Sequence, residues 1–143
     1  MEISDVRRRT RDAIEQWKRQ SAERRARQDA AARAWSAVLT RVVVPVTQQI
    51  SQVLRAEGYP VQVFTPADRV RISAERSGED YVELSLETDG SDAVLVAHSS
   101  RQRGRETIAD ERVLVRGAEA IAALRDEELL DYLLESLARV LER

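Results

Sequence analysis

The chain has 143 residues, of which 43% are hydrophobic and 34% are charged, and this composition indicates one folded domain and excludes a disordered chain. Its net charge of −2 gives the molecule as a whole no attraction to nucleic acid or to an anionic membrane. The absence of cysteine excludes disulfides, thiolate catalysis and cysteine-ligated zinc, and it is typical of a reducing compartment. No signal peptide or membrane-spanning run is recognisable, so we expect a cytoplasmic protein without a membrane partner.

The first 34 residues contain ten basic and six acidic side chains, a net charge of +4. Placed on a helix at about 100° per residue, the basic residues scatter around the axis, and most have an acidic neighbour three or four positions away. This pattern favours a solvated, salt-bridged helix over a nucleic-acid arm. One face of the helix differs from the rest, because it has four apolar residues: Ile3, Val6, Ile14 and Trp17.

These four residues have no core of their own within the charged segment. A helix over residues 3–57 would be about 80 Å long at 1.5 Å per residue, much longer than the rest of a small domain. We therefore predict that residues 1–34 project from a single α+β domain at 35–143. Tryptophan is enriched in interface hot spots, so the segment is predicted to form an oligomer interface, most simply in a two-fold homodimer. The alternative is that the helix folds back and packs Trp17 within the same chain.

The strongest helical pattern is a stripe of apolar residues that follows this segment: Trp35, Leu39, Val42, Val43, Val46, Ile50, Val53 and Leu54. Gly58 and Pro60 are typical of a helix end, since glycine adopts the left-handed conformation there and proline cannot continue the helix. Pro45 removes a helical hydrogen bond and disfavours helix at the preceding residue. Because the stripe continues on both sides of Pro45, we predict one kinked helix rather than two separate helices.

Beyond Gly58 the pattern alternates between apolar and polar residues, as in half-buried antiparallel strands. Strands are predicted at residues 61–65, 69–75, 81–88, 93–99 and 112–116. A pairing of Ala74 with Val82 places the apolar residues of two strands on one face. The sequence DGSD at 89–92 predicts a tight hairpin turn, and residues 100–110 form either a polar loop or a long hairpin.

The final helix is predicted to be capped by Asp126 and to bury one stripe of residues: Leu130, Leu133, Leu134, Leu137, Val140 and Leu141. The predicted fold is therefore α+β. It consists of a long N-terminal helix, a four- or five-stranded antiparallel sheet, and a C-terminal helix on the same face of the sheet.

No residue pattern predicts catalysis, a cofactor or a metal site, and we expect a protein that is not an enzyme. The only histidine, His98, lies near the end of a predicted strand and has no recognisable partner in the sequence. A zinc site with one histidine and no cysteine would need carboxylates almost alone. Neither phosphate-binding glycine motif is present. An enzyme or ligand site near His98 is accordingly the weakest of three hypotheses.

Arg101, Arg103 and Arg105 alternate along a predicted extended segment and would share one face of a hairpin. Such a face is a candidate contact for an anion or a protein partner. The leading hypothesis is a non-catalytic interaction or adaptor protein, homodimeric through its N-terminal helix and able to bind another protein. The alternative is a nucleic-acid-associated dimer that uses the Arg-rich helix faces and the Arg101–Arg105 loop.

Overall fold

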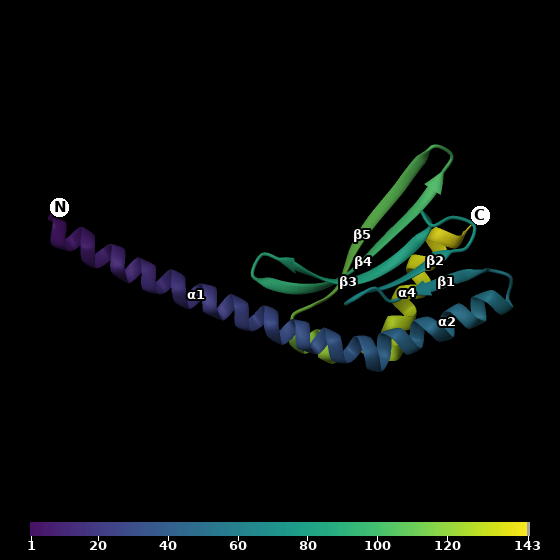
Figure 1. Cartoon of the computed structure of the whole chain (residues 1–143), viewed down its shortest axis with the longest axis horizontal. Helices are drawn as coiled ribbons and strands as arrows, with labels where there is room; N and C mark the ends of the chain where they lie inside the picture. The colour runs from purple at the N-terminus through teal and green to yellow at the C-terminus, as the bar shows by residue number, and fades with distance from the viewer. Residues whose placement is uncertain (143) are drawn as a thin grey trace.

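The computed structural model describes residues 1–142 and has the predicted α+β architecture, with the C-terminal helix on the same face of the sheet as the long N-terminal helix (Figure 1). The helices are α1 (Ile3–Val38), α2 (Val44–Ala56), α3 (Ala118–Ala122) and α4 (Asp126–Leu141), and a π-helical segment, η1 (Leu39–Val43), joins the first two. The strands are β1 (Val61–Phe64), β2 (Val70–Ala74), β3 (Tyr81–Asp89), β4 (Asp92–Arg103) and β5 (Glu106–Arg116).

The sheet is a meander in the order β1-β2-β3-β4-β5, and every neighbouring pair is antiparallel. The predicted DGSD turn is confirmed, since Asp89 pairs with Asp92 and Gly90 between them has a φ of 64°, which glycine adopts without steric strain. Residues 100–110 form the long hairpin rather than a loop, because the β4–β5 pairing continues to Arg103 and Glu106. This hairpin extends beyond the other strands (Figure 1).

The predicted pairing of Ala74 with Val82 is wrong by two residues, since Val82 pairs with Ile72. The amide of Ala74 instead donates to the carbonyl oxygen of Asp80 at 2.8 Å, so the connection between β2 and β3 is shorter than predicted. A shift by an even number of residues preserves the side-chain faces. The apolar residues of both strands therefore still line the core, as the alternation predicted.

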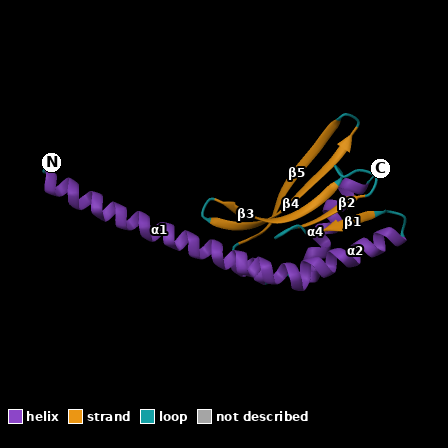
Figure 2. Cartoon of the chain, viewed as in Figure 1, coloured by secondary structure: helices purple, strands orange, loops and turns teal. Residues whose placement is uncertain are grey.

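The core lies between one face of the sheet and the helices, all of which lie on that side (Figure 2). Trp35 is confirmed as a core residue, with 2% of its surface exposed. Its indole Nε1 donates a hydrogen bond to the carbonyl oxygen of Asp68 at 2.6 Å. Asp68 lies between β1 and β2, so this bond connects α1 to the far edge of the sheet.

The predicted kinked helix is confirmed, because the chain remains helical through Pro45 and bends at η1 (Figure 1). Pro45 lies in the first turn of α2, a position that tolerates a residue without an N–H donor. Immediately before it, the amide of Val44 donates to the carbonyl oxygen of Leu39, the five-residue spacing of a π-helix. The wider turn therefore separates two regular helices and precedes the proline.

The π turn changes which residues of α2 face the core. One additional residue in a turn rotates the following helix by about 100° relative to the preceding one. Val43, Thr47 and Ile50 are consequently buried, whereas Val53, predicted as a core residue, is 62% exposed. Val46 is only partly buried. Within α2 the predicted stripe was therefore right for Ile50 and for the partly buried Val46 and Leu54, but it wrongly included Val53 and omitted Thr47, because it assumed an uninterrupted α-helical period.

The start of α4 also differs from the prediction. Asp126 is the first helical residue rather than the cap, the N-cap is Arg125, and no side chain caps the helix. The acidic first turn still complements the positive end of the helix dipole. Leu129 is fully buried, whereas Leu130 and Leu134 are 38% and 47% exposed. The predicted stripe thus omitted one core residue and included two surface residues.

The N-terminal part of α1 projects away from the domain (Figure 2). Arg27 and Ala31 line a small recess with Ala93 and Gly117, and Ala31 is the first buried residue of the helix. Residues 3–26 precede this contact and are called the projecting segment below. None of the described helices is both long enough and apolar enough to cross a membrane.

Candidate functional surfaces

The projecting segment exposes apolar side chains along one face. Ile3 is 78% exposed, Val6 48%, Ile14 37% and Trp17 61%. At 100° per residue, the four side chains fall within an arc of about 80°, and we call them the apolar strip. The structure thus places the four predicted interface residues together on one helix face, outside the domain core.

The rest of the projecting segment is charged and faces solvent. Among residues 1–142, Arg8 with Asp5 is the one ion pair formed within this segment, at 3.2 Å and between side chains that are 69% and 44% exposed. The other pairs that the sequence spacing allows within this segment are not formed between side chains that the structure describes. Exposed pairs of this kind contribute little to stability, so this ion pair adds little to the stability of the helix.

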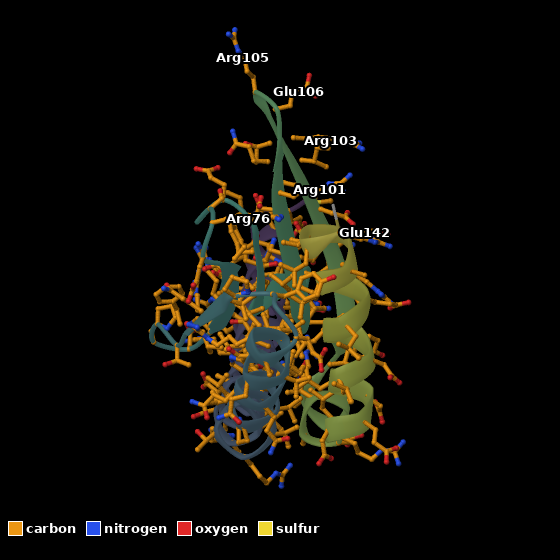
Figure 3. The ribbon with its side chains drawn as sticks, turned by 90° about the vertical axis from the view of Figure 1, so that its right-hand side faces the viewer. Arg76, Arg101, Arg103, Arg105, Glu106 and Glu142 are labelled. Carbon is orange, nitrogen blue, oxygen red and sulfur yellow. The ribbon has the colours of Figure 1, made fainter. Side chains whose placement is uncertain are left out.

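Arg101, Arg103 and Arg105 all lie on the β4–β5 hairpin, but only the first two belong to a strand. Arg105 lies at the tip, and Arg103 and Arg101 follow lower on the hairpin (Figure 3). The guanidinium of Arg101 donates to the carbonyl oxygen of Arg139 in α4 at 3.2 Å. Arg103 pairs across the hairpin with Glu106. Arg101 and Arg103 are two positions apart on β4 and therefore lie on the same face of the sheet, whereas Arg105 lies in the turn.

The β4–β5 hairpin is attached to α4 by ion pairs. Arg112 in β5 hydrogen-bonds to Glu135, and Arg139 bonds to Asp110 at 2.9 Å. The Arg112 guanidinium lowers the pKa of the Glu135 carboxyl through this hydrogen bond and its positive charge. These contacts lie at the surface and align α4 with the strand.

A groove of about 500 Å³ runs between α2 and α4. It contains the surface residues that the helix stripes had assigned to the core. Its apolar lining residues are Val46, Ile50, Val53, Leu54, Leu130 and Leu134, and Asp126 and Glu127 lie at its edge. The groove is therefore apolar with acidic groups beside it.

The sheet face opposite the helices has several acidic groups, of which Glu83 and Asp89 are paired with arginines. Glu83 has a side chain that is only 8% exposed, and it accepts hydrogen bonds from Arg69 at 3.1 Å and Arg71 at 2.7 Å. The guanidinium of Arg71 also lies over the ring of Tyr81, 3.8 Å from its centroid. This cluster neutralises the buried carboxylate of Glu83 on the outer surface of β2 and β3.

His98 lies beside this cluster, between two other glutamates. Its Nε2 is 2.9 Å from Oε1 of Glu87 in β3, and its Nδ1 is 3.9 Å from Oε2 of Glu111 in β5. One donor atom from each residue can be chosen so that all three lie within 4.8 Å of one another. The His98 side chain is 30% exposed, that of Glu87 39% and that of Glu111 60%. The three residues therefore form a solvent-accessible cluster of nitrogen and oxygen donors.

The sequence singled out His98 but neither glutamate, because both lie more than ten positions away. Only the pairing of β3, β4 and β5 brings the three together. The available signals were the turn glycines Gly90 and Gly104, which set the two hairpin registers. A register derived from Gly104 would have placed Glu111 opposite His98.

Comparison with known proteins identified no relative of the chain. No protein-family model matches the chain, and no curated protein or solved structure matches it.

Proposed function

We propose that this protein is a non-catalytic interaction protein that forms a homodimer through the projecting segment of α1. The observation behind the proposal is Trp17, a large side chain that is 61% exposed on a helix outside the core. Apolar surface surrounded by polar residues is typical of protein interfaces, and tryptophan is enriched at their centres. A partner that covers Trp17 would also cover Ile14 and Val6 on the same face.

The spacing of the apolar strip supports a second copy of the chain as that partner. Consider two projecting segments in antiparallel orientation, with the two-fold axis at Thr10. Ile3 then faces the partner's Trp17, and Val6 faces the partner's Ile14, because the members of each pair are equally far from Thr10 along the chain. The strip is thus complementary to itself, as a two-fold interface requires.

The expected dimer is of moderate strength. Each partly exposed apolar side chain would contribute about 1–2 kcal/mol on burial. Both copies supply the four strip residues, a contact of limited apolar area, and we expect a dissociation constant in the micromolar range, set mainly by Trp17 and Ile14.

The proposal is tested by the mass of the full-length protein in solution, measured by light scattering across a concentration series. We expect the mass to rise from monomer to dimer through the micromolar range. The double variant Ile14→Ala, Trp17→Ala should dimerise about 100-fold more weakly, because it removes the largest apolar contacts on the strip.

Arg19→Gln is the matched control. Arg19 lies about 160° from Trp17 on the same helix, so this variant should dimerise like the wild-type protein. A wild-type mass that stays monomeric at tens of micromolar contradicts the proposal. So does a dimer whose dissociation constant is the same in the double variant, since its interface would then lie elsewhere.

A further inference from the structure

We propose that the groove between α2 and α4 binds an amphipathic helix of another protein. The apolar side chains of that helix lie in the groove, and its ends carry lysine or arginine. This contact adds a partner to the proposed function, and it does not depend on the dimer, because the dimer uses the projecting segment of α1.

The groove extends along the full length of α4. A hollow of about 500 Å³ begins beside Val46 and Asp126, in the first turns of the two helices. A second hollow of about 700 Å³ shares Leu54 and Leu134 with the first and ends beside Glu142. The two helices therefore run in the same direction and leave one continuous groove, called the α2–α4 groove below. Along α4, residues 126–142 span about 24 Å at 1.5 Å per residue, which accommodates a bound helix of about four turns.

The walls of the α2–α4 groove expose large apolar side chains. Val53 is 62% exposed, Leu134 47%, Tyr59 45% and Leu130 38%. Among residues 27–142, seven large apolar side chains are exposed to this degree, and four of them line this groove. The two leucines are four positions apart on α4, so apolar contacts recur at each turn. This repeat matches the side chains of an amphipathic helix that lies in a groove.

Both ends of the α2–α4 groove are acidic. Asp126 and Glu127 lie at its first end, and Glu57 and Glu142 lie at its second end, where α4 finishes (Figure 3). The described residues that line the two hollows include no lysine or arginine. A partner with cationic ends therefore complements the charge of the groove.

The two glutamates at the second end lie where a carboxylate is unfavourable. Glu57 is the C-cap of α2 and Glu142 is the C-cap of α4, so each lies beside the negative end of a helix dipole. Arg55 and Arg139, in the last turns of the same helices, bond instead to the glutamate that follows β2 and to an aspartate of β5. A lysine or arginine of the partner would stabilise both carboxylates and both helix ends.

The projecting segment of a second copy is the alternative occupant, because it is also amphipathic and contains several cations. Its apolar strip has no large apolar side chain between Val6 and Ile14, a gap of about two turns. The α2–α4 groove, by contrast, has apolar lining residues along its whole length. The spacing therefore favours a different helix, with an apolar residue at every turn.

The test is calorimetric titration of the tag-free, full-length protein at low salt with a synthetic helical peptide of about 16 residues, the length of the groove. The peptide has a row of leucines one turn apart and lysines at both ends. A second peptide has glutamate in place of every lysine. We expect one lysine peptide per chain with a micromolar dissociation constant, and at least 10-fold weaker binding of the glutamate peptide.

The double variant Val53→Gln, Leu134→Gln should bind the lysine peptide about 10-fold more weakly, because it replaces apolar walls without changing the charge. Val113→Gln is the matched control, since Val113 is 44% exposed on β5 outside the groove, and it should bind like the wild-type protein.

The double variant Glu57→Gln, Glu142→Gln tests the charge at the second end. It should weaken the lysine peptide about 5-fold at low salt, and much less at high salt, because salt screens exposed charges. Glu119→Gln is the control, because Glu119 is an exposed carboxylate on α3 outside the groove, and it should leave the affinity unchanged.

The proposal is overturned if the lysine peptide does not bind at tens of micromolar, or if the glutamate peptide binds equally well. It is also overturned if Val53→Gln, Leu134→Gln does not weaken binding. Loss of self-association in that variant, measured by light scattering, would mean that the groove holds a second copy and would overturn it as well. Circular dichroism checks that each variant is folded, and ¹⁵N NMR of the wild-type amides should show peptide-induced shifts on α2 and α4. A monomeric protein that still binds the lysine peptide would contradict the dimer alone.

Discussion

The two tryptophans are chemically identical and have opposite environments. Trp35 is 2% exposed and donates its indole N–H to the carbonyl oxygen of Asp68. Trp17 is 61% exposed and has no such bond among the described residues. Both lie on the same face of one helix, eighteen positions apart. Their difference in exposure therefore reflects their positions, because Trp35 lies within the domain and Trp17 lies in the projecting segment.

Trp35→Phe should destabilise the protein by about 1–3 kcal/mol, because it leaves a gap in the core and removes the hydrogen bond to Asp68. Trp17→Phe is the matched control and should change the free energy of unfolding by less than about 0.5 kcal/mol. Urea unfolding followed by circular dichroism, at a concentration low enough to keep the chain monomeric, measures both. Equal losses from the two variants would mean that Trp17 also packs within its own domain.

The environment of a single residue could be predicted from the sequence only where that environment depends on neighbours along the chain. The burial of Trp35 followed from helical spacing, and the positive φ of Gly58 followed from its place at a helix end. The environment of His98 depends instead on glutamates from two other strands. Its partners are defined by two hairpin registers, and an error of two residues in either one assigns different neighbours.

At the level of elements, the period of a helix is predictable only while its turns are regular. Val42, Val43, Val44 and Val46 are all apolar, so the sequence around Pro45 fits either the α-helical phase or the phase after a π turn. The structure selects the second, which buries Thr47 and exposes Val53. The polar threonine is tolerated because its hydroxyl donates to the carbonyl oxygen of Val43 at 2.7 Å.

Two alanine substitutions in α2 test this rotation. Ile50→Ala removes a buried side chain and should cost about 2–4 kcal/mol. Val53→Ala truncates a side chain that is 62% exposed, and should change stability by less than about 0.5 kcal/mol. An uninterrupted α-helix would place both residues in the core. A loss of more than 1.5 kcal/mol for Val53→Ala would therefore contradict the π turn, by the usual cost of core truncation.

The sheet was predictable in its faces but not in its register. Alternation identifies the residues of β2 and β3 that point into the core, and any even shift in the pairing leaves those faces unchanged. The register itself depends on how many residues the turn uses. The short DGSD turn defined it correctly for β3 and β4, whereas the connection around Gly78 did not define it for β2 and β3.

At the level of the whole molecule, projection of α1 was predictable from length alone. A helix over the first 57 residues spans about 80 Å, and a domain formed by the remaining residues is too small to cover it. The surface that covers Trp17 could not be predicted from length, because in the proposed dimer it belongs to a second molecule. Four cations of the projecting segment, Arg7, Arg11, Lys18 and Arg25, fall within an arc of about 40° at 100° per residue, and the apolar strip lies beside them.

Hydrogen exchange gives the proposed dimer a test that does not depend on mass. In dilute solution the projecting segment is a helix without tertiary contacts, and isolated helices of this size are marginally stable in water. Its amides should then exchange rapidly, while those of the central strand β3 remain protected. As the concentration rises through the micromolar range, protection of residues 6–20 should increase about 10-fold or more, because only the dimer buries the strip.

The strand amides provide the internal reference for that measurement, since dimerisation through α1 leaves the sheet contacts unchanged. The Ile14→Ala, Trp17→Ala variant should show rapid exchange in the projecting segment at every concentration. Protection that is high and independent of concentration would instead mean that the segment packs against its own domain in solution. Rapid exchange in the wild-type protein at all concentrations would mean that no second copy covers Trp17.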